Sequence, residues 1–181
     1  MSIADPTSFA EAVRSFRSQD GRTLNELSAE HPVLVVFLRH TGCAFCREAL
    51  SDLQKQRGKI ERSGTSIALV HMVSNDEAAR FFRSYGLDNV PRFSDPERKL
   101  YQAFDLHGGN LWQLIGPSVF WRGMKAFFSG HGAGRIRGDV AQLPGTFVLH
   151  RGEIVQAFRN KTAADRPDYA ELACAVPSES K

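Results

Sequence analysis

Two cysteines separated by two residues are the side chains in this sequence best suited to chemistry. Cys43 and Cys46 follow an unbroken apolar run over 33–38, and a helical pattern of apolar residues begins at the second cysteine. A helix that starts near Cys43 directs unpaired N–H groups and the positive end of its dipole at the sulfurs, which favours a thiolate over a thiol. The spacing therefore predicts a dithiol that can cycle between two thiols and a disulfide.

The position of each cysteine on the predicted helix suggests a role for each sulfur. The apolar stripe of that helix is formed by Cys46, Ala49, Leu50 and Leu53, at the spacing of an amphipathic helix. Cys46 should therefore lean towards the core, and Cys43, one turn earlier, should face solvent. In this interpretation the thiolate of Cys43 attacks a disulfide or a peroxide, and Cys46 resolves the intermediate.

Two other interpretations of the cysteine pair remain open. A structural zinc site needs four ligands, and the sequence adds only Cys174 and six scattered histidines to the pair. Two buried cysteines that simply pack in the core are the other alternative. The position of the pair between a predicted strand and a predicted helix favours redox chemistry over both.

Composition and charge narrow the class of protein. The chain of 181 residues suits a single domain, 1–181, with a substantial core. A formal charge of +3 with dispersed basic residues gives no reason to expect nucleic acid as a partner. The sequence has no apolar run of about eighteen residues, so we expect no membrane span. Its first residues do not resemble a signal peptide, so we expect a cytoplasmic location, where disulfides are usually transient.

The first half of the chain predicts a strand, a helix and a second strand. Residues 8–16 are expected to form a short helix within an N-terminal cover of about 1–30. The apolar runs 33–38 and 67–73 predict two strands buried on both faces, separated by the cysteine helix, which should end near residue 62. Strands joined through such a helix should be parallel, with a right-handed crossover.

The second half completes a mixed α/β sheet with helices on both faces. The expected elements are a helix from Ser74 to Gly86, an extended piece at 90–94, a helix capped by Asp95 with Pro96 at its first position, a hairpin of 146–149 and 154–158, and a final helix at 165–175. An insertion of about 108–142, aromatic and then glycine-rich, is expected to cover the core. The alternatives are an apolar wall for substrate or a dimer face.

The order of these elements resembles the thioredoxin fold, and finer features resemble its peroxiredoxin branch. Residues 93–104 are similar to the "SDP" segment of the alkyl hydroperoxide reductase and thiol-specific antioxidant (AhpC/TSA) proteins. Residues 39–48 match the string RHxGCxFCRE of a peroxiredoxin-like subgroup. The resemblance covers about 21–175. It implies a thioredoxin-like fold in its peroxiredoxin-like variant and a thiol-dependent oxidoreductase.

Two positions depart from the pattern of ordinary peroxiredoxins. Their PxxxTxxC motif falls on Arg39, Cys43 and Cys46, so its proline and threonine are missing, and their peroxide-attacking cysteine corresponds to Cys46. Their arginine before the late strand corresponds to Pro144. A proline facing a pair of cysteines is instead a thioredoxin feature, and there it is cis. The resemblance therefore implies a cis bond before Pro144, with a trans proline at the start of a strand as the alternative.

Several other residues receive supporting or structural roles. Positive charge beside the cysteines could favour a thiolate, and the supporting residues are Arg39, His40, Thr41, Arg47 and Thr146. His71 is expected to be a hydrogen-bonded core residue. Cys174 is expected to pack in the final helix, with a role as a third resolving thiol as the alternative. No acidic residue lies in 33–38, so the proton acceptor of the resolving cysteine is not identified.

The sequence therefore predicts a thiol–disulfide oxidoreductase or antioxidant with Cys43, Cys46 and Pro144 as its catalytic residues. No cofactor or metal is expected. The expected partners are a disulfide or hydroperoxide substrate and a reducing system of the thioredoxin or glutathione type, and a homodimer is left open. The first alternative is a thiol peroxidase in which Cys46 attacks a hydroperoxide or lipid endoperoxide and Cys43 resolves. The second is a redox-inactive interaction module.

Overall fold

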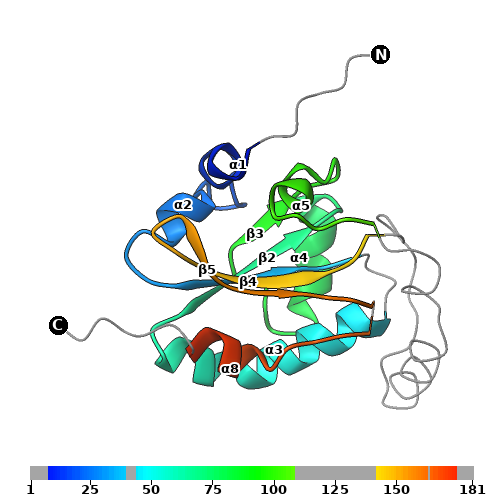
Figure 1. Cartoon of the computed structure of the whole chain (residues 1–181). Helices are drawn as coiled ribbons and strands as arrows, with labels where there is room; N and C mark the ends of the chain where they lie inside the picture. Colours follow the sequence, from blue (N-terminus) through cyan, green and yellow to red (C-terminus); the bar gives the residue numbers. More distant parts are fainter. Residues whose placement is uncertain (1–7, 40–43, 109–141, 163, 175–181) are drawn as a thin grey trace.

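The computed structural model describes residues 8–39, 44–108, 142–162 and 164–174, which form a five-stranded sheet covered on both faces (Figure 1). The strand order is β3-β2-β1-β4-β5. The strands are β1 (Val33–Phe37), β2 (Ser66–His71), β3 (Arg92–Ser94), β4 (Gly145–His150) and β5 (Glu153–Arg159). β1, β2 and β3 run parallel, whereas β4 is antiparallel to both β1 and β5. The predicted mixed sheet is confirmed.

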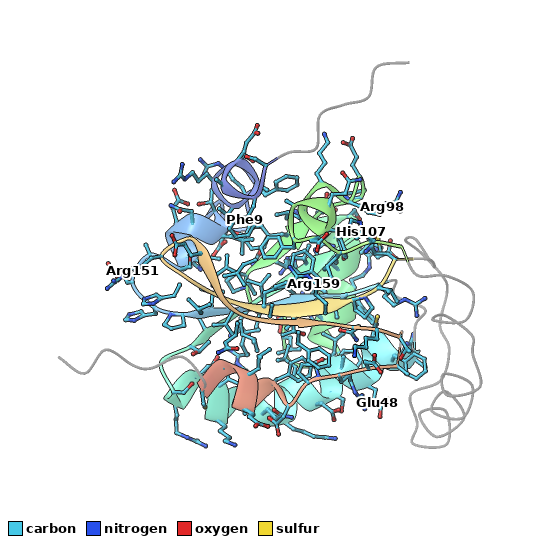
Figure 2. All side chains as sticks on the ribbon, viewed as in Figure 1. Phe9, Glu48, Arg98, His107, Arg151 and Arg159 are labelled. Carbon is cyan, nitrogen blue, oxygen red and sulfur yellow. The ribbon has the colours of Figure 1, made fainter. Side chains whose placement is uncertain are left out.

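Helices cover the two faces of the sheet in two groups (Figure 1). One face packs against α1 (Phe9–Ser15), α2 (Leu24–Leu27) and α5 (Lys99–Ala103), and the other packs against α3 (Ala44–Arg62), α4 (Asn75–Arg83) and α8 (Tyr169–Cys174). Side chains fill the space on both sides of the strands, and the labelled Phe9 of α1 points into the first of these layers (Figure 2). None of the described helices is long and apolar enough to cross a membrane.

The central strand β1 explains why its sequence is continuously apolar. Leu34 and Val36 lie in the core beneath α3 and α4, whereas Val33, Val35 and Phe37 lie in the core beneath α1 and α5. Successive side chains of a strand point to opposite faces, and helices cover both faces here. Every residue of β1 is therefore buried, as the sequence predicted.

Several helix starts follow local capping rules. Ser74 caps α4 by accepting a hydrogen bond from the Glu77 N–H (3.4 Å), as predicted. The helix α2 was not predicted, and it begins with a capping box in which Thr23 and Glu26 make bonds of 2.7 and 3.1 Å. This helix and α1 form the described part of the predicted N-terminal cover. Residues 109–141, almost all of the predicted insertion, lie outside the described residues.

The predicted start of α5 at Pro96 is wrong by three residues. The helix begins at Lys99, because Arg98 before it adopts a left-handed conformation (φ 61°). Asp95 still acts as a cap, and its buried carboxylate accepts hydrogen bonds from the N–H groups of Lys99 (3.0 Å), Leu100 (2.8 Å) and Tyr101 (3.3 Å). One side chain thus satisfies three N–H groups of the first turn from outside the helix.

The final helix also begins later than predicted, at Tyr169 instead of residue 165. The Asp165 carboxylate is already engaged, because it accepts hydrogen bonds from the N–H groups of Lys161 (2.9 Å) and Thr162 (2.8 Å). The next residues include Pro167, which restricts the residue before it to extended conformations. Asp168 then accepts the Ala170 N–H at 3.0 Å and starts α8.

We predict that Asp95→Ala lowers the free energy of unfolding by about 2 kcal/mol. The substitution leaves three N–H groups at a buried helix start without their acceptor. Urea unfolding followed by circular dichroism measures this change. Glu97→Ala is the matched control, since it removes a nearby but exposed carboxylate paired with Lys99, and it should leave the free energy of unfolding almost unchanged. Equal effects of both substitutions would contradict the capping role.

Candidate active site

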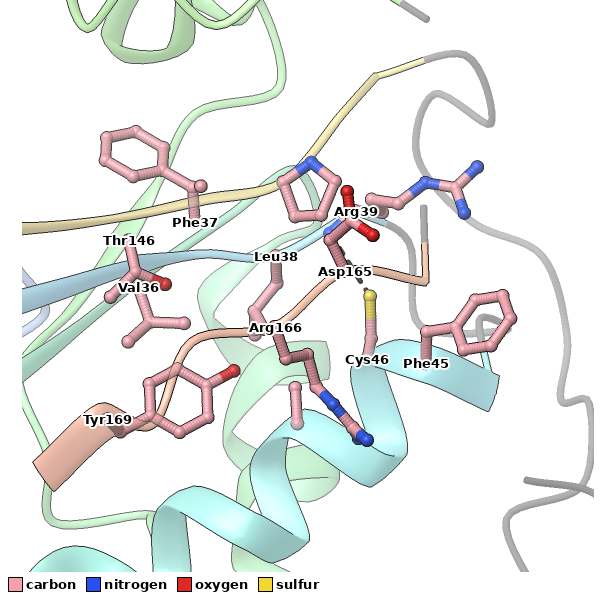
Figure 3. Close-up of a pocket in the computed structure, with 13 residues that line it drawn as sticks. Val36, Phe37, Leu38, Arg39, Phe45, Cys46, Thr146, Asp165, Arg166 and Tyr169 are labelled. Carbon is pink, nitrogen blue, oxygen red and sulfur yellow. Dashed lines mark hydrogen bonds between the residues drawn. The ribbon is translucent and has the colours of Figure 1, made fainter. Parts of the chain in front are cut away.

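Cys46 lies in the first turn of α3 with its sulfur against the end of β1. Its side chain is buried, with 3% of its surface exposed. The backbone N–H of Arg39 donates a hydrogen bond to its Sγ (3.3 Å), drawn as the dashed line in Figure 3. A hydrogen bond to a sulfur and the start of a helix both favour negative charge on that sulfur. The predicted placement of Cys46 at a helix start, facing the core, is confirmed.

The end of β1 is held in place by contacts to its neighbours. The Leu38 N–H donates to the Val70 carbonyl (3.0 Å), which extends the pairing with β2 one residue beyond the strand. The Tyr101 hydroxyl from α5 donates to the Leu38 carbonyl and also reaches the Val70 carbonyl (3.3 Å). These contacts fix the peptide that presents the Arg39 N–H to the sulfur.

The sulfur borders a small pocket, here called the Cys46 cavity, between β1, β4, α3 and the segment before α8 (Figure 3). The centre of a water molecule can occupy about 20 Å³ of this pocket, which is room for one water-sized group. Its walls are formed by Val36, Phe37, Leu38, Arg39, Phe45, Cys46, Ala49, Pro144, Gly145, Thr146, Asp165, Arg166 and Tyr169. The predicted site residues Cys46, Arg39, Pro144 and Thr146 thus meet at one pocket.

The side chains of Arg39 and Arg47, expected to place positive charge beside the sulfur, are engaged elsewhere. The buried Arg39 donates through Nε to the Gln142 carbonyl (2.9 Å), and its side chain extends away from the Cys46 sulfur in Figure 3. The guanidinium of Arg47 lies over the ring of Phe81, 5.8 Å from its centre. Arg39 therefore contacts the sulfur through its backbone, and Arg47 packs against α4.

The expected cis bond before Pro144 is wrong. No cis peptide bond occurs within the described ranges, which include both Leu143 and Pro144. The segment enters β4 directly, because Gly145 already pairs with Phe37, and the Leu143 N–H is bonded to the His107 carbonyl (3.3 Å). An extended entry into a strand is compatible with the intrinsically preferred trans form. Pro144 still lines the Cys46 cavity.

Arg166 is a pocket residue that sequence reasoning missed. It lines the Cys46 cavity, and its guanidinium is held by two carboxylates of α3, Glu48 (2.8 Å) and Asp52 (3.2 Å). These three residues join the segment before α8 to the helix that carries Cys46. No spacing in the sequence relates residue 166 to the cysteine motif, because the contact depends on how α8 docks on α3.

The expectation that Cys174 packs in the core is wrong, because its side chain is exposed. The neighbouring Ala173 carbonyl accepts a hydrogen bond from Thr65, just before β2 begins. Cys46, in contrast, shares a cavity with His71 at the other end of β2. The two ends of that strand are roughly 20 Å apart. Cys174 therefore lies too far from Cys46 to resolve it within one chain.

Some predicted site residues lie outside the described residues. These are Cys43, His40 and Thr41, so the two-cysteine pair and the roles given to these residues stay predictions. Within the described part of the chain, no group of three histidine, cysteine, aspartate or glutamate side chains is arranged to hold a metal ion.

His71 is a hydrogen-bonded core residue, as predicted. Its ring is buried, and Nδ1 lies 3.0 Å from the Val73 carbonyl oxygen. Burial lowers the pKa of His71 to about 4, a shift that the Val73 carbonyl opposes and the nearby positive charge of Arg92 reinforces. The ring is therefore neutral in the folded protein at neutral pH.

Solved structures of other proteins share this fold. The bacterioferritin comigratory protein of Xanthomonas campestris, which has alkyl peroxide reduction activity, superposes with a TM-score of 0.60 at 20% identity, covering 88% of this chain and 87% of that chain. Peroxidoxin BcpB from Mycobacterium tuberculosis gives a TM-score of 0.60 at 16% identity and covers 88% of each chain. The fold is thus the α/β thioredoxin-like fold in the form found in peroxiredoxins.

The sequence comparison then gives the family. The model of the AhpC/TSA antioxidant enzymes matches residues 52–162, and the chain belongs to this family. Prostamide/prostaglandin F synthase of Danio rerio is 23% identical over 159 residues, which are 84% of this chain and 78% of that protein. Peroxiredoxin-like 2A of Xenopus tropicalis is 26% identical over 166 residues, 88% of this chain and 66% of that protein. The family match begins after both cysteines, so it does not test their roles.

We predict that the free energy of unfolding falls as the pH is lowered from about 6.5 to about 4, partly through His71. The unfolded histidine takes up a proton near pH 6.5, whereas the buried ring does so only near pH 4, so acid favours the unfolded state. This contribution can reach about 3 kcal/mol. Urea unfolding of the parent and of His71→Asn across this range measures it. Parallel pH dependences of the two proteins would contradict the prediction.

Proposed function

We propose that this protein is a thiol peroxidase in which Cys46 is the attacking sulfur. The observation that carries the proposal is the position of its Sγ, which accepts the Arg39 N–H at 3.3 Å and borders a cavity with room for one water-sized group. The hydrogen bond favours the thiolate, and a peroxide oxygen is of the size that the cavity admits. The alternative role of Cys46 in the sequence analysis thus becomes the main proposal.

The burial of the sulfur supports a peroxide over a protein disulfide as the substrate. With 3% of its surface exposed, Cys46 is poorly placed to meet a disulfide on another protein. The trans Pro144 also lacks the bond geometry on which the comparison with thioredoxins depended. Membership of a family of antioxidant enzymes points the same way. A redox-inactive module could bury its cysteine equally well, and the variants below separate the two.

The proposed reaction is a two-electron oxidation of sulfur. The Cys46 thiolate attacks one peroxide oxygen, so that an S–O bond forms while the O–O bond breaks. The sulfur becomes a sulfenic acid, and the leaving oxygen takes up a proton to give water or an alcohol. Cys43 then attacks the sulfenic sulfur, which forms a disulfide and releases water. A dithiol of the thioredoxin or glutathione type would return the pair to the reduced state.

The substrate class that we propose is a hydroperoxide, with a lipid endoperoxide as the second candidate. The alkyl peroxide reduction activity of the Xanthomonas protein supports the first. The name of the Danio rerio relative, a prostamide/prostaglandin F synthase, supports the second. The Cys46 cavity favours the smaller reacting group, since only about 20 Å³ of it is open to the centre of a water molecule.

We predict that Cys46→Ser abolishes the reaction with hydrogen peroxide and with an organic hydroperoxide, because it removes the attacking sulfur. Cys43→Ser should still be oxidised once, and its sulfenic acid should persist, because no second thiol condenses with it. Stopped-flow kinetics measure the oxidation, and labelling with dimedone followed by mass spectrometry locates the sulfenic acid on Cys46.

Cys174→Ala is the matched control, since this exposed thiol lies at the other end of the sheet and its loss should not change the rate. Two results would refute the proposal. One is fast oxidation of Cys46→Ser that Cys43→Ser abolishes, together with rapid reduction of insulin disulfides, which would restore Cys43 as the attacking sulfur. The other is no oxidation of any variant, which would indicate a redox-inactive module.

A further inference from the structure

The hydrogen bonding of His71 fixes which of its ring nitrogens carries the proton. Nδ1 lies 3.0 Å from the Val73 carbonyl oxygen, and a carbonyl oxygen can only accept a hydrogen bond. Nδ1 must therefore be the donor. In the neutral ring Nε2 then holds an unshared electron pair and acts as an acceptor.

This acceptor is buried without a partner among the described residues. His71 is 3% exposed, and its Nε2 makes no hydrogen bond to any of the residues that the structure describes. A buried polar atom without a partner typically costs about 1–3 kcal/mol. The ring packs in the core through its hydrogen bond to the Val73 carbonyl and its contact with the Phe82 ring (5.6 Å between ring centres). Neither contact involves a hydrogen bond to Nε2, so packing does not explain why a polar atom is buried there.

His71 and Cys46 form walls of the same small cavity, here called the His71 cavity. It shares three wall residues with the Cys46 cavity, and the centre of a water molecule can occupy about 10 Å³ of it. Its walls are Leu38, Arg39, Cys46, His71, Met72, Val73, Phe81 and Phe82. Most of this lining is apolar. The cavity therefore brings a thiol donor, the Cys46 side chain, and the unpartnered Nε2 of His71 to one small space.

The charges around the ring keep Nε2 available at neutral pH. Arg92 on β3 repels a proton from the ring, and burial disfavours the charged form, so that the pKa of His71 falls to about 4. Arg92 does not line the cavity. Among the described wall residues, Arg39 beyond β1 is the one with a charge, and α4 contributes the rings of Phe81 and Phe82. Nε2 is therefore unprotonated at neutral pH. It is also a weak base in the resting protein, so it would take the thiol proton as the sulfur reacts and not before.

We propose that Nε2 of His71 is the proton acceptor of the Cys46 thiol, an inference that rests on the proposed role of Cys46 as the attacking sulfur. The S–H proton moves to Nε2 as the sulfur becomes the thiolate that attacks the peroxide, and the S–O bond forms while the O–O bond breaks. The ring then gives up this proton and the departing oxygen takes one up, so that water or an alcohol leaves. The peroxide is the oxidant, the sulfur is oxidised to sulfenic acid, and His71 returns to its neutral form.

The test uses a parent protein with Cys43→Ser and Cys174→Ser, in which Cys46 is the only thiol. His71→Asn is the informative variant, because an asparagine amide can still donate to the Val73 carbonyl but has no counterpart of Nε2. The pH dependence of the Cys46 reaction is measured with hydrogen peroxide and, separately, with methyl methanethiosulfonate, a small thiol reagent that contains no peroxide.

Below the pH at which the thiol ionises unaided, His71→Asn should react about 100-fold more slowly than the parent, which is a typical loss for a general base. Above that pH the two rates should converge, because the thiolate no longer needs an acceptor. Ser94→Ala is the matched control. It removes another hydrogen bond to the same Val73 carbonyl, donated by the Ser94 hydroxyl at 2.7 Å, and should retain the pH profile of the parent.

A His71→Asn profile that coincides with that of the parent, or lies below it by a constant factor at every pH, would overturn the proposal and leave His71 a structural residue. If His71→Asn does not fold, ¹⁵N NMR of His71 in the parent and in Cys46→Ala decides. The Nε2 signal should shift when the thiol is removed, and an unchanged signal would refute the contact. If the parent and all variants react slowly with hydrogen peroxide, but the pH dependence of the reaction with methyl methanethiosulfonate still depends on His71, only the peroxidase function is refuted.

Discussion

The structure depends on the burial of one strand on both of its faces. Helices cover both sides of β1, which fixes where the strand ends and where α3 lies above that end. The peptide N–H of Arg39 then meets the Cys46 sulfur one residue beyond the last strand contact of Leu38. The hydrogen bond to the sulfur is thus set by backbone positions, which the pairing of Leu38 with Val70 and the hydroxyl of Tyr101 hold in place.

This constraint explains which parts of the molecule could be predicted from the sequence. The β1 run, the cap at Ser74 and the turn between β4 and β5 follow rules that act over a few residues. That turn has Arg151 and Gly152 at φ 54° and 78°, as a tight hairpin requires. These elements were all expected at or near their observed positions. The placement of Cys46 at a helix start, facing the core, belongs to the same group.

Features that depend on contacts between distant segments were predicted incorrectly or missed. The trans bond before Pro144, whose strand enters the sheet beside Phe37, is one such feature. The exposure of Cys174 follows from how α8 docks on α3, and the same docking brings Arg166 to Glu48. An apolar pattern gives the face of a helix that is buried, but it does not determine which residue of that face lies at the margin of the contact.

The sulfur of Cys46 forms part of the wall of two cavities, one beside β4 and the segment before α8, the other beside the end of β2 and α4. In the proposed reaction these two spaces have separate tasks, since the oxidant approaches from the first and the proton departs into the second. In an enzyme with this arrangement, the peroxide and the proton-accepting histidine do not compete for the same space. The preference of such an enzyme for an oxidant and its dependence on pH can therefore change independently, through substitutions among the wall residues that the two cavities do not share.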